Sequence, residues 1–331
     1  MIIENSKTYS LTDVENIFFR PAFCGKAAEE MGIRVLYNLP MPTKVPLFSH
    51  NNKILKKFAP GWQGGNASTL TQKEIALTKL KAESAYSAED YFSTIYEIMV
   101  ASSDVNLGDL SGTELEQAET ELFRRALVDS VYTNTWFGDS NGVVSNINNF
   151  DGFITRIIAA GENGEDLPIE LCSEEYYADS AVEILRDTWT KSPDQLRALA
   201  ADGNLAFFVS SELYDNYKFY LDDKGIAESQ GEVSGRQVLT YHGIPLIEVP
   251  TFGCEMKRAK AFCVLTDRRN LVLALNTADS PEKEIHMWYN PDEMENRQRV
   301  VFLAGTTIVD ETLLSGVLFD NGLFFNDGSE L

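Results

Sequence analysis

The sequence predicts an α+β fold built as one body with two extensions. Three observations predict this class: a long uninterrupted helical stretch after residue 112, a lysine-rich two-stranded excursion before it, and a series of short strands after it. A chain of 331 residues is long enough to bury a sizeable core. No repeat, low-complexity tract or linker divides the chain, so the extensions are expected to belong to the same body.

Composition and charge restrict the classes of function. A hydrophobic content of 44% with 24% charged residues is typical of a folded protein and excludes global disorder. No apolar run approaches the length of a membrane span, and the acidic N-terminus lacks the basic flank of a secretory signal. The net charge of −22 disfavours binding to nucleic acid through a basic face. We therefore expect a protein that works in a cytoplasm, or in something assembled there, without a membrane partner.

The charge is unevenly distributed along the chain. Residues 44–81 contain seven lysines and a single acid, Glu74, so their net charge is +6. Because the whole chain has a net charge of −22, the remaining residues together carry −28. A basic segment on an acidic body favours docking between copies of the same chain, because opposite patches attract and help to fix register. A solvated lysine-rich hairpin is an equally good interpretation of the charge alone.

Residues 1–45 are predicted to be an N-terminal arm. A short helix is expected to stop before Pro21, and Pro40 and Pro42 impose extended backbone on the residues around them. Such an arm has little to pack on within its own fold, so it is expected to lie over a neighbouring molecule or to stay free of the body.

Residues 46–90 are predicted to form an extended hairpin. The stretch KILKKFAPGW leads to a glycine-rich tip at Gly61–Gly65, and ASTLTQKEIALTKLKAES returns with alternating polar and apolar residues. An isolated hairpin is marginal in water, so this one needs a partner surface. Trp62 at the tip is either a hinge anchor or a contact residue.

Residues 91–138 are predicted to contain a spine helix. Thr113 is a good N-cap, Glu116 completes a capping box, and Gly138 is a C-terminal stop. Apolar residues recur every three or four positions between them and form a broad stripe. At 1.5 Å per residue the helix would be roughly 35 Å long, which suits an element that crosses the molecule.

Residues 139–250 are predicted to form a compact mixed lobe, and residues 251–331 strands that return to the body. The elements expected in the lobe are loops at 139–170, a helix from Ser173, a helix with Ser192 as N-cap that ends at Gly203, a buried strand at 205–210, a helix from Ser211 to Gly225, and a hairpin at 237–250 turning at His242 and Gly243. Beyond it we expect two strands joined by Asp267–Asn270, then strands at 283–289, 298–304, 306–309 and 315–319.

Side chains that carry chemistry form no recognisable site. The cysteines are too scattered for a disulfide framework or a zinc knuckle, the histidines have no ligand spacing, and paired carboxylates are expected to be solvated helix ends and turns. No phosphate loop or nucleophile elbow occurs. The sequence therefore predicts no catalytic, cofactor-binding or metal-binding residues. The residues considered are Cys24, Cys172, Cys254, Cys263, His50, His242, His286, Glu174, Glu175, Asp222, Asp223, Asp292 and Glu293.

Four stretches carry a recognisable order of elements. They are SGTELEQAETELFRRALVDSVY leading into WFGD, DSAVEILRDTWTKSPDQLRALAADGNLAFFVSSELYDNYKFYL, YHGIPLIEVP, and AFCVLTDRRNLVLALN. Together they resemble the major capsid proteins of tailed bacteriophages, which have the Hong Kong 97-like fold. The resemblance covers nearly the whole chain and implies an N-terminal arm, an extended loop, a spine helix in a peripheral domain, and an axial domain.

The resemblance implies a structural protein and not an enzyme. Copies would assemble as hexamers and pentamers into an icosahedral virion shell around double-stranded DNA, in the host cytoplasm, with portal and scaffolding proteins as further partners and no cofactor. Arm-like sequence begins near residue 10, so no fused scaffolding domain is expected. A shell wall made of this acidic protein would not bind DNA tightly and would release it readily. The subunit-contact candidates are Lys53, Lys56, Lys57, Trp62, Lys73, Lys79 and Lys81, of which the last three are possible crosslink donors by position.

Two other functions stay open at this point. An encapsulin-type shell, which shares the fold, would hold protein cargo in place of DNA. A hydrolytic enzyme built on dispersed carboxylates would need a pocket with convergent acids of perturbed pKa.

Overall fold

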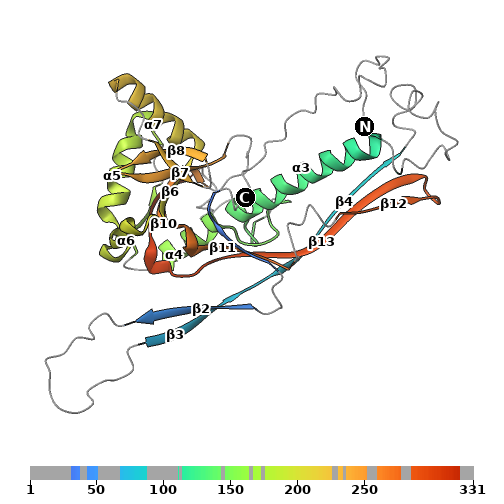
Figure 1. Cartoon of the computed structure of the whole chain (residues 1–331), viewed down its shortest axis with the longest axis horizontal. Helices are drawn as coiled ribbons and strands as arrows, with labels where there is room; N and C mark the ends of the chain where they lie inside the picture. Colours follow the sequence, from blue (N-terminus) through green and yellow to red (C-terminus); the bar gives the residue numbers. More distant parts are fainter. Residues whose placement is uncertain are drawn as a thin grey trace, which may run out of the picture.

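A computed structural model describes residues 31–37, 43–50, 68–87, 111, 114–142, 146–163, 167–172, 176–225, 230–233, 236–251, 259–276 and 285–320. Within these ranges the chain is mixed α+β, as predicted, with sheets of two, five and seven strands (Figure 1). The predicted contact residues Lys53, Lys56, Lys57 and Trp62 lie outside the described residues, as does most of the predicted arm.

The two-stranded sheet projects from one side of the body (Figure 1). Strand β2 (Thr43–His50) pairs antiparallel with β3 (Ser68–Ile75) along its whole length. The sequence places the outgoing strand from Lys53 onward, whereas the structure has a strand already at Thr43. The paired strand therefore begins within residues 1–45, the segment predicted as the arm.

The five-stranded sheet is organised around β13 (Glu295–Ile308), a strand of 14 residues. The prediction of separate strands at 298–304 and 306–309 is wrong, because β13 runs through Gly305 without a break. On one side it pairs with β4, and on the other with β12 and then β11. The partners are β4 (Thr78–Ser87), β12 (His286–Asn290), β11 (Leu271–Leu275), and β1 (Arg34–Leu36), which extends the sheet beyond β11.

The predicted spine helix is confirmed as α3 (Glu114–Phe137). Burial alternates along β13, as expected for a strand with one covered face, and α3 provides the cover. The cluster between them contains Leu127 with the partly buried Phe123 and Val131 from the helix, facing Val300 and Phe302 from the strand. On the opposite face, Ile75 and Leu77 cover the β11 side of the sheet, whereas the part made by β4 and the first half of β13 is exposed.

The seven-stranded sheet and its helices form the mixed lobe, drawn at the left of Figure 1. The predicted strand LAFFVS is its buried strand β6, and the turn at His242 and Gly243 has left-handed backbone at both residues, with φ of 51° and 79°. The sheet comprises β5 (Ile169–Cys172), β14 (Leu314–Asp320), β10 (Ala259–Asp267), β6 (Leu205–Ser210), β9 (Ile244–Val249), β8 (Arg236–Tyr241) and β7 (Gln230–Val233), in that order.

The helices of the lobe differ from the sequence prediction at two points. The helix expected from Ser173 begins only at Ala181, after a 3-10 turn at Ala178–Ser180. The helix after β6 ends at Gly225 as predicted, but Ser192 is not the N-cap of the next helix. Its hydroxyl donates to the Trp189 carbonyl at 2.6 Å and closes the preceding helix, while Pro193 takes the N-cap position. The helices of the lobe are α5 (Ala181–Lys191), α6 (Asp194–Ala198) and α7 (Ser211–Lys224). No helix in the described ranges is long and apolar enough to cross a membrane.

One helix lies where the sequence predicts only loops. Helix α4 (Phe153–Asn163) interrupts the stretch 139–170, and its residues Phe153, Ile154 and Ile157 are fully buried. It packs beside α3 and β5, so it belongs to the junction between the two large sheets. The signal that could have found it is its apolar spacing, which the flanking turn residues obscure.

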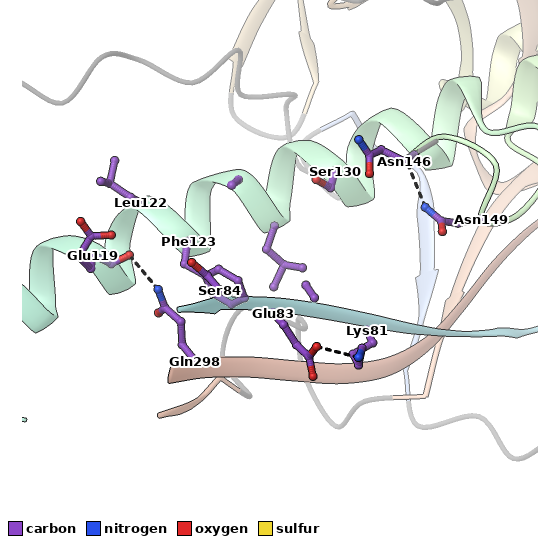
Figure 2. A pocket seen from close by; sticks show the side chains of 13 residues that line it. Lys81, Glu83, Ser84, Glu119, Leu122, Phe123, Ser130, Asn146, Asn149 and Gln298 are labelled. Carbon is purple, nitrogen blue, oxygen red and sulfur yellow. Dashed lines mark hydrogen bonds and ion pairs between the residues drawn. The ribbon is translucent and has the colours of Figure 1, made fainter. Parts of the chain in front are cut away.

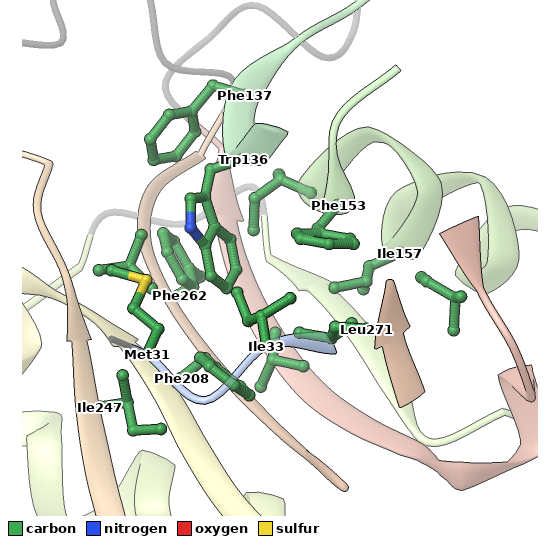
Figure 3. Close-up of a cluster of buried hydrophobic side chains, with 14 of the residues drawn as sticks. Met31, Ile33, Trp136, Phe137, Phe153, Ile157, Phe208, Ile247, Phe262 and Leu271 are labelled. Carbon is green, nitrogen blue, oxygen red and sulfur yellow. The ribbon is translucent and has the colours of Figure 1, made fainter. Parts of the chain in front are cut away.

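The central core lies where the two large sheets meet (Figure 3). Trp136 near the end of α3 is 1% exposed and has Phe153, Phe208 and Phe262 around it, with ring centroids at 5.3, 5.4 and 6.4 Å. Met31, at the start of the described chain, joins the same cluster. These side chains come from distant parts of the sequence, so the core ties the lobe to the spine helix.

Candidate assembly surfaces

The root of the projecting hairpin is held tightly by the body. Ile75 and Leu77 are buried on either side of Ala76. Both pack against Val272 and Ala274 of β11. At the same point the chain crosses β13, where a side chain on Gly305 would collide with the Ala76 carbonyl oxygen. The hairpin is therefore fixed at its base and extends away from the molecule.

Lys73 lies close to this root and is engaged within its own chain. Its Nζ is 2.5 Å from Glu311 Oε1, and the pair lines a pocket of about 300 Å³ with Asp151 and Arg156. Burial lowers the pKa of the Arg156 guanidinium, although the Asp151 and Glu311 carboxylates act in the opposite direction. Arg156 Nε donates to Thr306 Oγ1 at 3.1 Å, which ties α4 to β13 beneath the hairpin.

The outer face of the five-stranded sheet carries cations and exposed apolar groups. Lys81 Nζ is 2.7 Å from Glu83 Oε2 on β4, and Arg299 of β13 reaches the same carboxylate at 3.9 Å. The Arg299 guanidinium also lies over the Trp288 ring, 5.3 Å from its centroid, and Trp288 is 39% exposed. Val301 is exposed next to Lys81 in the register of the two strands. A mixed charged and aromatic face of this kind is typical of protein contacts.

A groove of about 600 Å³ runs between α3 and β4 (Figure 2). Its helix wall includes Leu122, which is 37% exposed, and its floor includes Gln298 of β13. The Gln298 side chain is 2% exposed and donates to the Glu119 carbonyl at 3.5 Å, but its Oε1 is buried without a hydrogen-bond partner. A smaller hollow along β4 continues the groove toward Lys79 and Asn134.

The lobe also exposes aromatic side chains. Tyr177, before α5, and Phe219, on α7, are each 62% exposed, and Tyr220 next to Phe219 is 37% exposed. Their neighbours Tyr176 and Tyr217 are instead packed against the lobe core. The sequence assigns the α7 aromatics to core or subunit contact; the structure buries Tyr217 and leaves Phe219 exposed.

Of the residues considered for chemistry, Cys24, Glu174, Glu175 and Cys254 lie outside the described residues. No group of three or more His, Cys, Asp or Glu side chains able to hold a metal ion occurs in the described part of the chain. Cys172 and Cys263 are not joined in disulfides, and burial raises the pKa of Cys263 to about 12. Asp222 and Asp223 are exposed at the end of α7, and Asp292 and Glu293 lie exposed in the turn between β12 and β13.

The structure places three of the predicted contact residues. Lys73 lies on β3, and Lys79 and Lys81 lie on β4, both exposed on the outer face of the sheet. Sequence reasoning missed the contribution of β12 and β13 to that face, in particular Trp288 and Arg299. The alternation in ENRQRVVFLA could have indicated it, because every second residue of such a strand points outward.

Comparison with known proteins identifies the fold. No family model and no curated protein matches the sequence. Among solved structures, a chain of the satellite phage P4 procapsid including size determination (Sid) protein is similar over 96% of this chain and 92% of its own, with 11% identity and a TM-score of 0.54. The capsid of an empty GTA particle matches over 97% and 95% with 14% identity and a TM-score of 0.54, and Gordonia phage Cozz over 92% and 88% with 13% identity and 0.53. The chain has the fold of phage capsid proteins.

Proposed function

We propose that this protein is the major capsid subunit of a tailed bacteriophage, with the Hong Kong 97-like form of the fold. The observation that supports the proposal most strongly is the agreement with phage and GTA capsid structures over nearly the whole length of both chains. The subunit would assemble in the host cytoplasm into hexamers and pentamers of an icosahedral shell that encloses double-stranded DNA. It has a structural and not an enzymatic role.

The parts of the chain have distinct roles in this proposal. The sheet around β13 and helix α3 form the peripheral domain, and the seven-stranded sheet with α5, α6 and α7 forms the axial domain. The exposed aromatics of the lobe, Tyr177 and Phe219, would meet neighbouring axial domains. Portal and scaffolding proteins would be further partners.

The projecting hairpin binds the surface of a neighbouring subunit. Its root is buried while its strands β2 and β3 have few contacts with the body, so it needs an outside surface to be stable. The lysines of residues 44–81 would dock on the acidic body of a neighbour, and Lys53, Lys56, Lys57 and Trp62 are the candidate contacts nearest the tip, with Lys73, Lys79 and Lys81 toward the root.

Electron microscopy of the purified protein tests the proposal. Closed shells are expected, and only small oligomers under all assembly conditions would contradict it. Combined replacement of Lys53, Lys56 and Lys57 by Glu should abolish shells. The matched control replaces three exposed cations of α5 and α6 by Glu, away from Phe219, and shells should persist; these are Arg186, Lys191 and Arg197.

The contents of shells from an infected or expressing cell distinguish the two kinds of container. Double-stranded DNA that resists added nuclease is expected inside a phage head, whereas a single protein species inside DNA-free shells would favour an encapsulin-type compartment. The free subunit should bind DNA weakly at physiological salt, because its net charge is −22. Tight binding under those conditions would contradict the role proposed for the acidic wall.

A further inference from the structure

Strand β4 forms an edge of the five-stranded sheet in the part of the chain that the structure describes. It pairs with β13 along one side from Thr78 to Ser87, and no described strand pairs with its other side. Between Thr78 and Ala85 this edge presents a row of outward N–H and C=O groups, which is a template for another strand. An edge of this length predicts a strand partner.

The groove beside α3 follows this edge. Four consecutive residues of β4 line it, from Lys81 to Ser84. Neighbouring residues of a strand point to opposite faces, so a run of four identifies the edge of the strand, and not one face, as the wall. The unpartnered Oε1 of Gln298 lies on the floor of the same groove, where a buried acceptor without a donor is unfavourable. Both observations indicate that the groove is an incomplete interface.

We propose that the β4 edge pairs with the β4 edge of a second copy, antiparallel across a two-fold axis, so that two peripheral sheets become one. This rests on the proposed self-assembly and names one contact that would build it. Such an interface is isologous, because the same surface serves both copies. Helix α3 then lies on the same side of the joined sheet in each copy.

The charges on the outer face select the register. If Ala82 lies opposite Ala82 of the second copy, Lys81 of each copy faces Glu83 of the other, and each of the four charges has opposite charges beside it and across from it. Centring the pair on Lys81 or on Glu83 would instead place like charges opposite each other. Centring it on Leu80 would oppose Lys79 to Lys81. The register at Ala82 is therefore the self-complementary one.

The helix wall of the groove supports the same arrangement. Leu122, Ala126 and Ser130 are exposed and succeed each other every four residues on the flank of α3 that lines the groove. Two of the three are small, which allows a second α3 to approach closely from the other side of the two-fold axis. The second copy would thus cover Leu122 and fill the groove.

A disulfide crosslink tests the register directly. Directly opposite residues of an antiparallel pair have Cα atoms about 4.5 to 5.5 Å apart, which is within the range that a disulfide bridges. Assembled Ala82→Cys protein should therefore give a covalent dimer as the main species on mild oxidation. Val301→Cys, which is exposed on the opposite face of the sheet and one strand in from the edge, should give only the background of the unsubstituted protein. Shells without the Ala82→Cys dimer would overturn this contact and leave the proposed function standing, whereas the absence of shells from the unsubstituted protein would contradict the function itself.

Charge exchange provides an independent test that does not rely on cysteine chemistry. Lys81→Glu alone and Glu83→Lys alone each create two like-charged pairs across the axis and should weaken dimerisation about tenfold. The double variant Lys81→Glu/Glu83→Lys restores both pairs and should recover it, with the crosslink at position 82 returning in parallel. Failure of the double variant to recover, while its monomer unfolds at the temperature of the unsubstituted protein, would overturn the register. A peptide or arm of the same chain in the groove would show as a β4 edge that never crosslinks between copies.

Discussion

Trp136 and Trp288 illustrate two regions of the molecule that follow different physical rules. Trp136 is 1% exposed at the junction of the two large sheets and is surrounded by aromatic rings from α4, β6 and β10. Trp288 is 39% exposed on the outer face of the five-stranded sheet, where its described ring contact is the Arg299 guanidinium. The first region stabilises the subunit, whereas the second leaves binding surface available for other molecules.

The largest expected effect is that of Trp136→Ala. The substitution removes a fully buried ring and leaves a cavity in a close-packed core, so it should lower the free energy of unfolding by about 3–5 kcal/mol. Urea denaturation of the subunit measures this loss. Trp288→Ala is the matched control, and a loss from Trp288→Ala as large as that from Trp136→Ala would contradict the distinction between the two regions.

Thiol reactivity sharpens the comparison in the lobe. Burial raises the pKa of Cys263 from 9.0 to about 12, so its thiolate fraction at pH 8 falls roughly a thousandfold. Alkylation of the native protein should therefore leave Cys263 unmodified while the partly exposed Cys172 reacts, as peptide mass spectrometry would show. The protection of Cys263 should disappear in denaturant. Equal rates at the two cysteines in the native state would refute the burial of β10.

An intermediate effect is expected for Asn270→Ala. Asn270 Nδ2 donates to the Asp310 carbonyl at 2.8 Å and to Thr266 Oγ1 at 3.1 Å, and its Oδ1 accepts from the Asp310 backbone N–H at 2.7 Å. Losing these buried partners at the passage between the two sheets should cost about 1–3 kcal/mol of unfolding free energy. Asn276→Ala, at the exposed end of β11, should change stability little. The prediction fails if both variants have the same midpoint in urea.

The smallest effect on subunit stability is expected for Arg299→Ala. The guanidinium contributes an exposed cation–π contact and a distant ion pair, which together are worth about 1 kcal/mol or less. If the outer face serves contacts between subunits, the yield of shells should nevertheless fall more than the yield with Arg186→Ala, an exposed arginine of the lobe. Light scattering during assembly, together with the urea midpoint of each variant, separates the two effects.

The sequence predicted the elements whose signals are local and continuous. The spine helix α3 follows from a stretch without glycine or proline that ends before Gly138, and α7 ends at Gly225 because that glycine takes the left-handed conformation that closes a helix. The sequence did not predict helix α4, because its eleven residues lie between turn-rich segments. Gly305 was read as a break in a strand, although it lies within β13 where another backbone crosses closely.

The candidate site shows the same division. Lysines 73, 79 and 81 could be singled out from charge, but only the structure shows that Lys73 pairs with Glu311 while Lys81 pairs with Glu83 on β4. Trp288 and Arg299 could not be placed next to each other from spacing, because their contact depends on the pairing of β12 with β13. Pairing between strands involves residues that no local pattern connects.

The sequence by itself determined the fold class, the spine helix, the β6 strand and the hairpin turn at His242 and Gly243, because these depend on interactions between residues close together in the chain. The tertiary structure decided which sheet each strand joins. Strands β10 and β11 are separated only by Arg268–Asn270, yet β10 pairs with β6 and β14 whereas β11 pairs with β1 and β13. Both are apolar and buried, so either sheet would accept them by composition, and the choice depends on long-range packing around Trp136.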